Sequence, residues 1–409
     1  MQASGSRPVS EAGRAPPVYD VDLYADDVQG NLYPHLAAMR SFAPIVYIPR
    51  YDVYYAVAYE AVKAALTNWR DFGSEGGIGL IDSRTVPGAR RAGPIVGVDP
   101  PDHTPHRRLF VKMLSPAVAK RMRASFDAVA ERMVGELIGR GRFDVVDELI
   151  RPFVVTVLAD AVGIPEEGRH HLLILGEMTL ASVGPHNERF DAANRAVIEA
   201  GSLQWLAEVS RRDALGPVGF GADVYAAVDR GEIDEETAAA LVTVFLFGGV
   251  DTTVTTLANG MRNFLDHPDQ YALLAANPMR AGEAFDEMLR FNVPVQQMYR
   301  TVTRPTELAG IALPQGARIG LGIAGANRDP THFADPDVFD ISRRSAGHFG
   351  FGTGIHACVG QMVARMEAEA LLSAFARRIA GFALVDEPER WISGGLASWT
   401  ALPIEVHAK

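Results

Sequence analysis

The segment HFGFGTGIHACVG spans residues 348–360 and contains Cys358, the single cysteine of the 409-residue chain. One cysteine cannot form an intramolecular disulfide, so nothing in this chain depends on an oxidising compartment. A free cysteine is most often a small buried hydrophobic residue. Two other interpretations stay open at this point, a catalytic nucleophile with His356 as its base and a metal thiolate.

If Cys358 is a metal ligand, the sequence is compatible with only one kind of metal centre. Zinc takes several Cys or His ligands and an iron–sulfur cluster about four cysteines, and the sequence has no such cluster here. A single thiolate is sufficient when a macrocycle supplies the other ligands, as in haem. The glycines let the backbone approach such a ligand closely. A helix predicted after Gly360 would direct its positive dipole end at the sulfur, so we expect Cys358 to be deprotonated without a basic side chain.

The segment resembles the haem-binding loop of the cytochrome P450 family, whose pattern is Phe-x-x-Gly-x-x-x-Cys-x-Gly. Phe351, Gly354, Cys358 and Gly360 match that pattern position for position. Other motifs follow in the family's order along almost the whole chain. The resemblance implies a mostly α fold with a minor β region, the cytochrome P450 triangular prism. It also implies haem b (iron protoporphyrin IX) with the thiolate of Cys358 as proximal ligand and Phe351 beside the cofactor.

Composition and charge fit a soluble globular enzyme, with 48% hydrophobic and 22% charged residues. The formal net charge of −11 argues against binding to nucleic acid or to anionic membranes. No run approaches the roughly 20 apolar residues of a membrane span, and the N-terminus lacks the apolar core of a signal peptide. We therefore expect a cytoplasmic protein with a flexible tail over residues 1–18 and a single haem-thiolate monooxygenase domain over residues 19–409.

Hydrophobic periodicity predicts a mostly helical chain. Residues 43–50 and 51–58 are rich in β-branched and aromatic residues and predict two strands joined by a turn. A second β cluster is predicted over residues 306–327. Apolar residues recur every three to four positions in four further segments, which predict helices over residues 59–68, 116–141, 233–267 and 359–380.

The segment FGGVDTTVTT, residues 247–256, lies in the middle of the longest predicted helix. Adjacent glycines inside a helix cost about 1 kcal/mol each relative to alanine, so we expect either a close approach or a local opening near Gly248. A helix–helix contact is sufficient to explain the glycines alone. The segment resembles the family's oxygen-binding groove over the haem. That resemblance implies that Asp251 and Thr252 are the acid–alcohol pair that delivers protons to bound dioxygen.

Glu287 and Arg290 lie three residues apart in EMLR, a spacing at which helical side chains pair. Taken alone, such a pair is an ordinary surface ion pair. The resemblance implies instead a buried structural pair that continues to Arg343. Loss of one partner would then leave a charge buried and unpaired.

The segment DPPDHTPHRRLF, residues 99–110, places His103 and Arg107 four residues apart on a predicted helix. A solvated basic helix is one interpretation. The resemblance implies instead that these two residues bind the haem propionates together with Arg300 and His356. Buried carboxylates require charge-assisted donors of this kind, and His356 then needs no role as a catalytic base.

The resemblance implies a monooxygenase that inserts one oxygen atom of O2 into its substrate, by hydroxylation or oxidative O-demethylation. The sequence shows no flavin or iron–sulfur segment, so we expect electrons from a ferredoxin and its reductase. Arg108, Lys112 and Arg365 are the basic residues expected to receive an acidic ferredoxin. A haem-thiolate sensor and a peroxide-driven peroxygenase are the alternatives. Asp251 and Thr252 argue against both, because neither alternative requires this proton delivery.

Several segments are similar to bacterial enzymes that oxidise para-substituted benzoates, notably by removing a methyl ether. That group carries Arg-Ser on the long helix, where it helps bind the carboxylate, and the matching residues here are Thr243 and Val244. Arg90 or Arg91 can provide another basic contact. We expect a small aromatic substrate that need not be a benzoate, with a terpenoid or other lipophilic ring compound as the alternative. The resemblance implies a pocket formed by Ile78, Leu80, Ser182, Val183, Val244, Phe247, Gly248, Val295, Gln297 and Met298.

Overall fold

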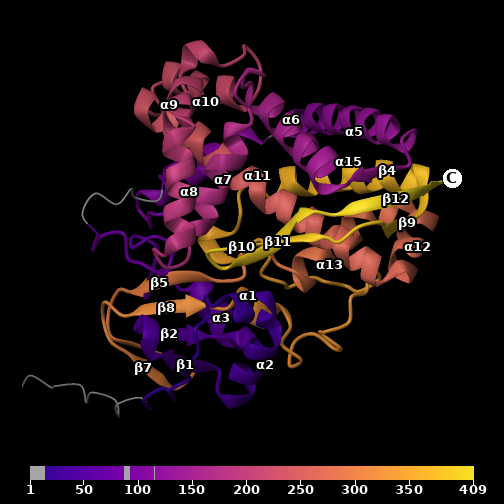
Figure 1. Ribbon diagram of the computed structural model, residues 1–409. Helices are drawn as coiled ribbons and strands as arrows, with labels where there is room; N and C mark the ends of the chain where they lie inside the picture. Colours follow the sequence, from indigo (N-terminus) through magenta and orange to yellow (C-terminus); the bar gives the residue numbers. More distant parts are fainter. Residues whose placement is uncertain (1–13, 87–92, 115) are drawn as a thin grey trace, which may run out of the picture.

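Helices make up most of the computed structural model, which describes residues 14–86, 93–114 and 116–409 (Figure 1). The helices are α1 (Asp26–Gly30), α2 (Leu32–Phe42), α3 (Tyr59–Thr67), α4 (His103–Met113), α5 (Pro116–Ile138), α6 (Arg151–Val162), α7 (His171–Ala181), α8 (Glu188–Glu199), α9 (Ser202–Val209), α10 (Phe220–Asp229), α11 (Glu235–Asp266), α12 (Pro268–Ala276), α13 (Ala281–Phe291), α14 (Ile323–Asn327) and α15 (Gln361–Arg378). The predicted mostly α fold with a minor β region is confirmed.

Within the described residues the strands are short and form four small sheets. They are β1 (Ile45–Ile48), β2 (Val53–Ala56), β3 (Phe72–Gly73), β4 (Arg142–Asp144), β5 (Met298–Val302), β6 (Thr306–Leu308), β7 (Ile311–Leu313), β8 (Arg318–Leu321), β9 (Ile379–Leu384), β10 (Glu389–Ser393), β11 (Leu396–Ala401) and β12 (Pro403–Ala408). The largest sheet has the strand order β1-β2-β8-β5-β3, and β2 and β8 form its parallel pair. The others pair β4-β12-β9, β10-β11 and β6-β7. In Figure 1 the largest sheet and α1 to α3 lie below the main body of helices.

The predicted secondary structure is largely present. β1 and β2 pair antiparallel across a short turn, in which Asp52 adopts the left-handed conformation with φ 51°. The four predicted helices correspond to α3, α5, α11 and α15. The predicted β cluster at 306–327 is wrong at its end, because residues 323–327 form α14. All five α14 residues are buried. A strand with one face in solvent would bury only every second residue.

The predicted flexible tail divides into two parts. Residues 1–13 lie outside the described residues. Arg14 pairs with Ile311, and Val18 pairs with Tyr47, each as a parallel bridge. The backbone N–H of Tyr47 also donates to the carbonyl of Pro17 at 2.9 Å. Backbone pairing therefore holds residues 14–18 against the sheet region.

Two hydrophobic cores organise the protein. The larger one is built around α11 and includes residues of α5, α6, α13 and α15. The smaller one joins α2 and α3 to the largest sheet. Helix α11 is long and apolar enough to cross a membrane by composition alone. Its buried residues pack in the larger core, so its hydrophobicity is explained by burial inside the protein.

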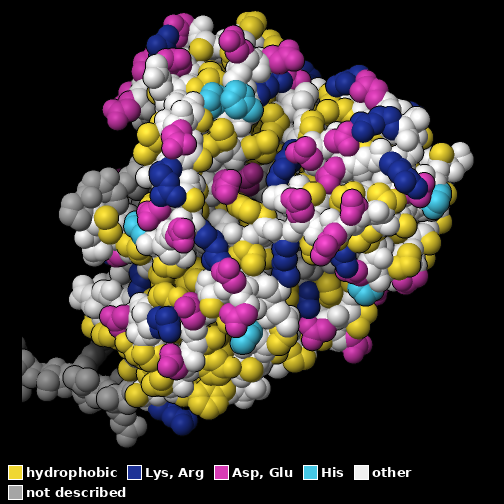
Figure 2. All heavy atoms as spheres, in the orientation of Figure 1, with side chains coloured by type: hydrophobic (Ala, Val, Ile, Leu, Met, Phe, Trp, Pro, Cys, Tyr) yellow, Lys and Arg dark blue, Asp and Glu magenta, His cyan; other side chains and the backbone are white. Residues whose placement is uncertain are grey.

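The face shown in Figure 2 carries Lys and Arg side chains interspersed with Asp and Glu. Many surface charges of the described residues are paired, for example Arg212 with Asp229 at 2.7 Å and Arg262 with Asp266 at 2.6 Å. Such exposed pairs contribute little to stability, typically about 0 to 1 kcal/mol each. They do divide this surface into small regions of opposite sign.

Candidate functional site

A cavity lies between α11 and the loop that carries Cys358. It encloses about 1450 Å³ of atom-free space, including its opening to solvent. Five of the predicted pocket residues lie on its wall, namely Ile78, Val244, Gly248, Val295 and Met298. Val244 and Gly248 are four residues apart on α11 and therefore share one helix face. A Cβ built at Gly248 would meet nothing within 4 Å, so this glycine borders open space.

The loop at residues 349–360 presents Cys358 to that cavity. The backbone N–H of Cys358 donates to the carbonyl of Phe351 at 2.7 Å, which closes the loop. Gly354 has φ 74°, and a Cβ there would lie 2.7 Å from the carbonyl oxygen of Leu66. Only glycine fits this position without strain. The side chain of Cys358 is exposed to the cavity although it lies inside the protein.

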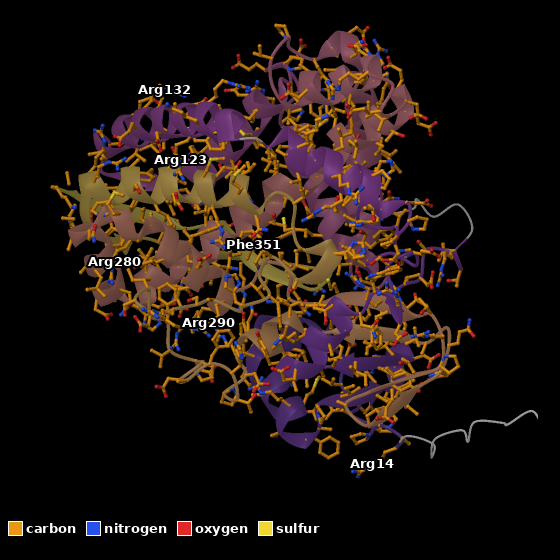
Figure 3. All side chains as sticks on the ribbon, turned by 180° about the vertical axis from the view of Figure 1, so that it is seen from behind. Arg14, Arg123, Arg132, Arg280, Arg290 and Phe351 are labelled. Carbon is orange, nitrogen blue, oxygen red and sulfur yellow. The ribbon has the colours of Figure 1, made fainter. Side chains whose placement is uncertain are left out.

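Phe351 lies near the middle of the molecule in Figure 3, which views it from behind. It lines the cavity, and the guanidinium carbon of Arg365 lies 4.9 Å from its ring centroid. The same aromatic ring thus contacts Arg365 by a cation–π interaction and forms part of the cavity wall.

Burial raises the pKa of the Cys358 thiol. The backbone N–H groups of Gly360 and Gln361 and the charge of Arg107 act in the opposite direction, and burial outweighs them. The backbone N–H groups therefore favour the thiolate, as expected, while burial opposes it. A haem iron bound to this sulfur would favour the thiolate further.

Four basic residues meet on one side of the cavity. Arg107, Arg300 and His356 line it, and the His103 ring lies edge-on to the His356 ring at a centroid distance of 4.6 Å. Arg300 is only 3% exposed, and burial lowers its pKa to about 10. Burial also lowers the pKa of His103 to about 4. Nε2 of His103 is buried and has no hydrogen-bond partner among the described residues.

This set of donors fits a haem. Arg300 donates a side-chain hydrogen bond to the carbonyl of its neighbour Tyr299 at 2.9 Å, and, within the described residues, the charge of Asp99 acts on it without a hydrogen bond between the two. Buried cations require anionic partners, and two propionates would provide them. His356 already holds one carboxylate, since its Nε2 lies 2.9 Å from Oδ1 of Asp99. The structure thus brings together the four residues that the resemblance implies, with Asp99 as an additional member.

Thr252 and Asp251 face different sides of α11. Thr252 lines the cavity, and its hydroxyl donates to the carbonyl of Gly248 at 2.8 Å. The helix is continuous through this point, so the predicted local opening at Gly248 is not observed. The close approach, which was the other expectation, is present at Gly249. A Cβ there would lie 2.8 Å from the side chain of Leu158 on α6. The carboxyl group of Asp251 points toward α7 and packs against Gly176.

Glu367 is a buried acid of the cavity wall that the sequence analysis missed. It lies on α15, is 1% exposed, and burial raises its pKa to about 8. A side-chain hydrogen bond from Thr253 acts in the opposite direction. The sequence does contain a signal for Glu367, since it is an acidic residue on the apolar face of the helix predicted over residues 359–380. Ile95, Val96 and Pro294 also line the cavity without having been predicted.

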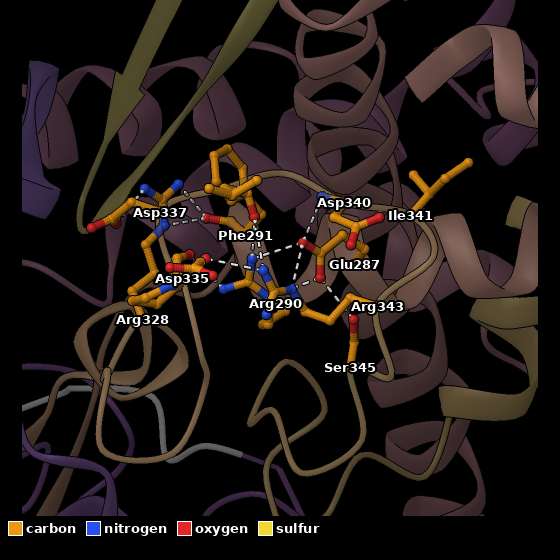
Figure 4. Close-up of polar contacts among 12 residues, drawn as sticks. Glu287, Arg290, Phe291, Arg328, Asp335, Asp337, Asp340, Ile341, Arg343 and Ser345 are labelled. Carbon is orange, nitrogen blue, oxygen red and sulfur yellow. Dashed lines mark hydrogen bonds and ion pairs between the residues drawn. The ribbon is translucent and has the colours of Figure 1, made fainter. Parts of the chain in front are cut away.

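The structure brings Glu287, Arg290 and Arg343 together (Figure 4). Both members of the first pair are fully buried, with Nη2 of Arg290 2.7 Å from Oε1 of Glu287. Arg290 also donates to the carbonyls of Pro336 at 2.7 Å and Val338 at 3.1 Å. Nε of Arg343 lies 3.5 Å from Oε1 of Glu287. This network ties α13 to the segment that precedes the Cys358 loop.

The remaining predicted pocket residues lie outside the described cavity wall. Leu80 and Val183 pair through their backbones, with a distance of 2.8 Å between N and O, and the Ser182 hydroxyl donates to the carbonyl of Thr179 at 2.6 Å. Gln297 is fully buried and accepts a hydrogen bond from the Tyr55 hydroxyl at 2.8 Å.

Local geometry explains why Gln297 does not line the cavity. Gln297 immediately precedes Met298, and adjacent residues of an extended segment face opposite sides. Phe247 is half-buried on α11 and packs against the larger core. Arg90 and Arg91 lie outside the described residues.

Comparisons with known proteins agree with this site. The family model of cytochrome P450 matches residues 282–380. The chain is 38% identical over 399 residues to cytochrome P450 CYP199A2 of Rhodopseudomonas palustris, covering 97% of this chain and 96% of that protein. It is 31% identical to the cytochrome P450 monooxygenase PikC of Streptomyces venezuelae, covering 91% and 90% respectively. The solved structure of P450BioI with a hexadec-9Z-enoic acid-ligated acyl carrier protein has a TM-score of 0.83 at 23% identity, covering 93% of this chain and 100% of that one.

The cavity, its thiol and its buried cations define a haem-thiolate protein. The chain belongs to the cytochrome P450 family. It is accordingly an oxygen-incorporating oxidoreductase that carries haem with Cys358, the single cysteine, as thiolate ligand. Its reaction uses O2, a redox partner and a lipophilic substrate.

Proposed function

We propose that this cytochrome P450 monooxygenase oxidises a small, neutral aromatic compound, by hydroxylation or oxidative O-demethylation, in the cytoplasm. The proposal rests on one observation: away from the basic residues, the wall of the cavity is apolar. Ile78, Ile95, Val244, Val295 and Met298 all contribute to this wall. Flat, apolar substrates fit such a lining, because they leave no polar group buried without a partner.

A carboxylated substrate has little support in this wall. The arginines that line the cavity, among the described residues, are Arg107 and Arg300, and we assign both to the haem propionates. Thr243 lies where the benzoate-oxidising enzymes carry Arg, and its hydroxyl lies 3.3 Å from the Ser210 hydroxyl. This contact turns the Thr243 side chain toward Ser210 at the C-terminal end of α9. A substrate carboxylate would therefore lack a charged partner here.

We expect a neutral para-methoxyphenol to bind at least about tenfold more tightly than para-methoxybenzoate, a difference of about 1.4 kcal/mol. The physical reason is the cost of burying an unpaired carboxylate. Titrations that follow the low-to-high spin change of the haem measure both dissociation constants. Matched pairs with ethyl and methyl para substituents control for size and shape.

Tighter binding of the carboxylate in every pair would contradict a neutral substrate and would direct attention to Arg90 and Arg91. Spin changes with a bulky terpenoid but with none of the aromatics would favour the alternative substrate class. A haem-thiolate sensor would give spin changes without product when reductant and O2 are supplied.

The side chains around the haem have distinct proposed roles. Bound haem with a thiolate ligand activates O2 for insertion into the substrate. Thr252 presents its hydroxyl to the cavity beside Gly248, where it can hold a proton donor close to bound dioxygen. Asp251 stores a proton on the opposite side of α11. The apolar wall excludes water from the reaction space, so protons reach it through these two residues.

Thr252→Ala is expected to uncouple electron use from product formation. Substrate dissociation constants should stay within about twofold of the wild-type value, because the hydroxyl bonds to the backbone and not to substrate. Electron consumption should continue, with most of the electrons recovered as hydrogen peroxide. Quantifying consumed reductant, peroxide and product in one reaction measures this. Thr252→Ser retains the hydroxyl and is the matched control, and full coupling in Thr252→Ala would exclude the proposed role.

We propose a ferredoxin, supplied by its reductase, as the electron donor. Arg108 is exposed on α4. Nζ of Lys112 lies 3.1 Å from Glu232, and Arg365 is paired with Asp286. Lys112 and Arg365 are thus partly neutralised, which limits their attraction of an acidic partner at long range. Arg108 then contributes most of the attraction among these three residues.

A further inference from the structure

A buried arginine binds the loop that carries one residue of the cavity wall. Arg318 lies on β8, is 7% exposed, and directs its guanidinium group at residues 77–80. Its Nη2 donates to the carbonyl of Gly77 at 2.9 Å and to that of Gly79, and its Nε donates to the carbonyl of Leu80 at 3.3 Å. One side chain thus holds three of the four carbonyl groups in this loop.

The remaining carbonyl, that of Ile78, is bound by the neighbouring strand. It accepts a hydrogen bond from the backbone N–H of Tyr299 on β5 at 2.9 Å. Ile78 and Met298, the residue before Tyr299, both line the cavity. The position of Ile78 on the wall therefore depends on the backbone to either side of it, which Arg318 binds.

The loop has little conformational preference of its own. Residues 76–79 read Gly-Gly-Ile-Gly, and glycine adopts many backbone conformations. A Cβ at Gly79 would lie 2.6 Å from the carbonyl oxygen of Ser182, so the loop passes closely against the C-terminal end of α7. The backbone N–H of Leu80 donates to the carbonyl of Val183 at 2.8 Å. Contacts with distant parts of the chain, rather than local propensity, therefore hold the loop in place.

The rest of the guanidinium group of Arg318 is bound as well. Its Nη1 donates to the Thr301 hydroxyl at 2.9 Å, and that hydroxyl lies 3.2 Å from Oδ2 of Asp82. A hydroxyl group thus links the buried cation to a carboxylate. The planar fork of arginine is suited to several acceptors at once, whereas lysine carries one compact ammonium group and cannot reach acceptors spread across the fork.

We propose that Arg318 is a positioning residue that fixes Ile78 on the cavity wall and thereby limits the size of the ligand that the cavity accepts. The inference rests on the proposed function only in taking this wall as the substrate wall. Arg318 is not among the described residues that line the cavity, so it acts through the loop and not by contact with a ligand.

Arg318→Lys should loosen the loop in the haem-loaded protein, because most of its carbonyl groups lose their donors. The amides of residues 77–80, including the Leu80 N–H, should exchange with solvent deuterium at least about tenfold faster. The N–H of Tyr299, which binds the Ile78 carbonyl, should also exchange faster. Helix α13 should keep its wild-type exchange rate and serves as the internal reference for global unfolding.

The size limit is measured with two imidazoles that differ by one ring, phenylimidazole and biphenylylimidazole. Both bind haem iron through a ring nitrogen, so the shift of the Soret band gives their dissociation constants whatever the natural substrate is. Ile78→Ala opens the wall without changing the loop contacts of Arg318. Arg318→Lys and Ile78→Ala should each lower the ratio of dissociation constants, larger imidazole over smaller, at least about fivefold.

A variant that combines both substitutions tests whether Arg318 acts through Ile78. Its ratio should lie within about twofold of that of the stronger single variant, since both substitutions affect the same part of the wall. Fully additive effects would show that Arg318 acts elsewhere and would overturn the proposal.

Arg304→Lys is the matched control for the loss of a guanidinium group. Nε of Arg304 lies 2.6 Å from Oδ1 of Asp71, and its side chain is 66% exposed. Loop exchange and the imidazole ratio should therefore keep their wild-type values. If Arg318→Lys does not fold, Thr301→Val is a milder substitute, because it preserves shape and removes one acceptor of the Arg318 fork. It should speed exchange at Leu80, and unchanged exchange there would count against the proposal.

Unchanged exchange of residues 77–80 in Arg318→Lys would overturn the proposal, and so would faster exchange with an unchanged imidazole ratio. The reduced, carbon monoxide-bound spectrum checks in each variant that the thiolate-bound haem is intact. The proposed function fails separately. If small aromatics give the wild-type protein no spin change and no product, while exchange and the imidazole ratio respond as expected, the substrate class is wrong and the role of Arg318 stands.

Discussion

Replacing Cys358 with serine is expected to abolish oxygenation completely. The cavity holds one thiol, and the sequence contains no second cysteine that could replace it. A serine hydroxyl does not supply the electron density that a thiolate gives to haem iron. The reduced, carbon monoxide-bound protein should lose the strongly red-shifted Soret band. Optical spectra and product analysis with the same substrate measure both consequences.

Cys358→His provides the matched comparison, because imidazole can still bind the iron. This variant should retain haem but show a carbonyl spectrum without the thiolate red shift. Stability of the apoprotein should change little in either variant, since Cys358 faces the cavity and not the packed core. A haem-loaded Cys358→Ser protein with the red-shifted band and normal turnover would refute the assignment.

Arg290→Met is expected to destabilise the protein by roughly 3–5 kcal/mol, because it leaves the carboxylate of Glu287 buried without its main partner. Both side chains are 0% exposed, and Glu287 is held further by the Ser345 hydroxyl at 2.7 Å and the backbone N–H of Asp340 at 3.1 Å. These two contacts carry no positive charge, and Arg343, whose Nε lies 3.5 Å from Oε1 of Glu287, is the cation that remains. Urea unfolding of the holoenzyme, followed by haem absorbance and by circular dichroism, measures the loss.

The ion pair of Arg280 and Glu283 provides a matched control near the start of the same helix. Its atoms lie 3.2 Å apart, but the side chains are 31% and 57% exposed. Arg280→Met should cost less than about 1 kcal/mol. If Arg290→Met does not fold, Glu287→Gln gives a milder test, because it preserves shape and one acceptor. Equal losses in the buried and the exposed pair would show that the network has no special structural importance.

The Cys358 loop shows how much a short sequence can determine. The need for glycine at a left-handed position, a single thiol and a following helix are local properties, and they predicted the loop and its ligand correctly. The hydrogen bond between Thr252 and Gly248 is also local, because it joins residues four apart on one helix. Such contacts follow from backbone geometry alone, so the sequence is sufficient to predict them.

The sequence by itself determined the family, the mostly α fold and the single thiol that can bind haem iron. The tertiary structure alone decided which side of each element faces the cavity, and it turned Gln297 into the protein interior, where its side chain accepts a hydrogen bond from Tyr55. It also set the environment of Cys358, Asp251 and Glu367, where burial raises each pKa. The physical reason is that desolvation depends on atoms brought together from distant parts of the chain, and no local sequence pattern encodes that environment.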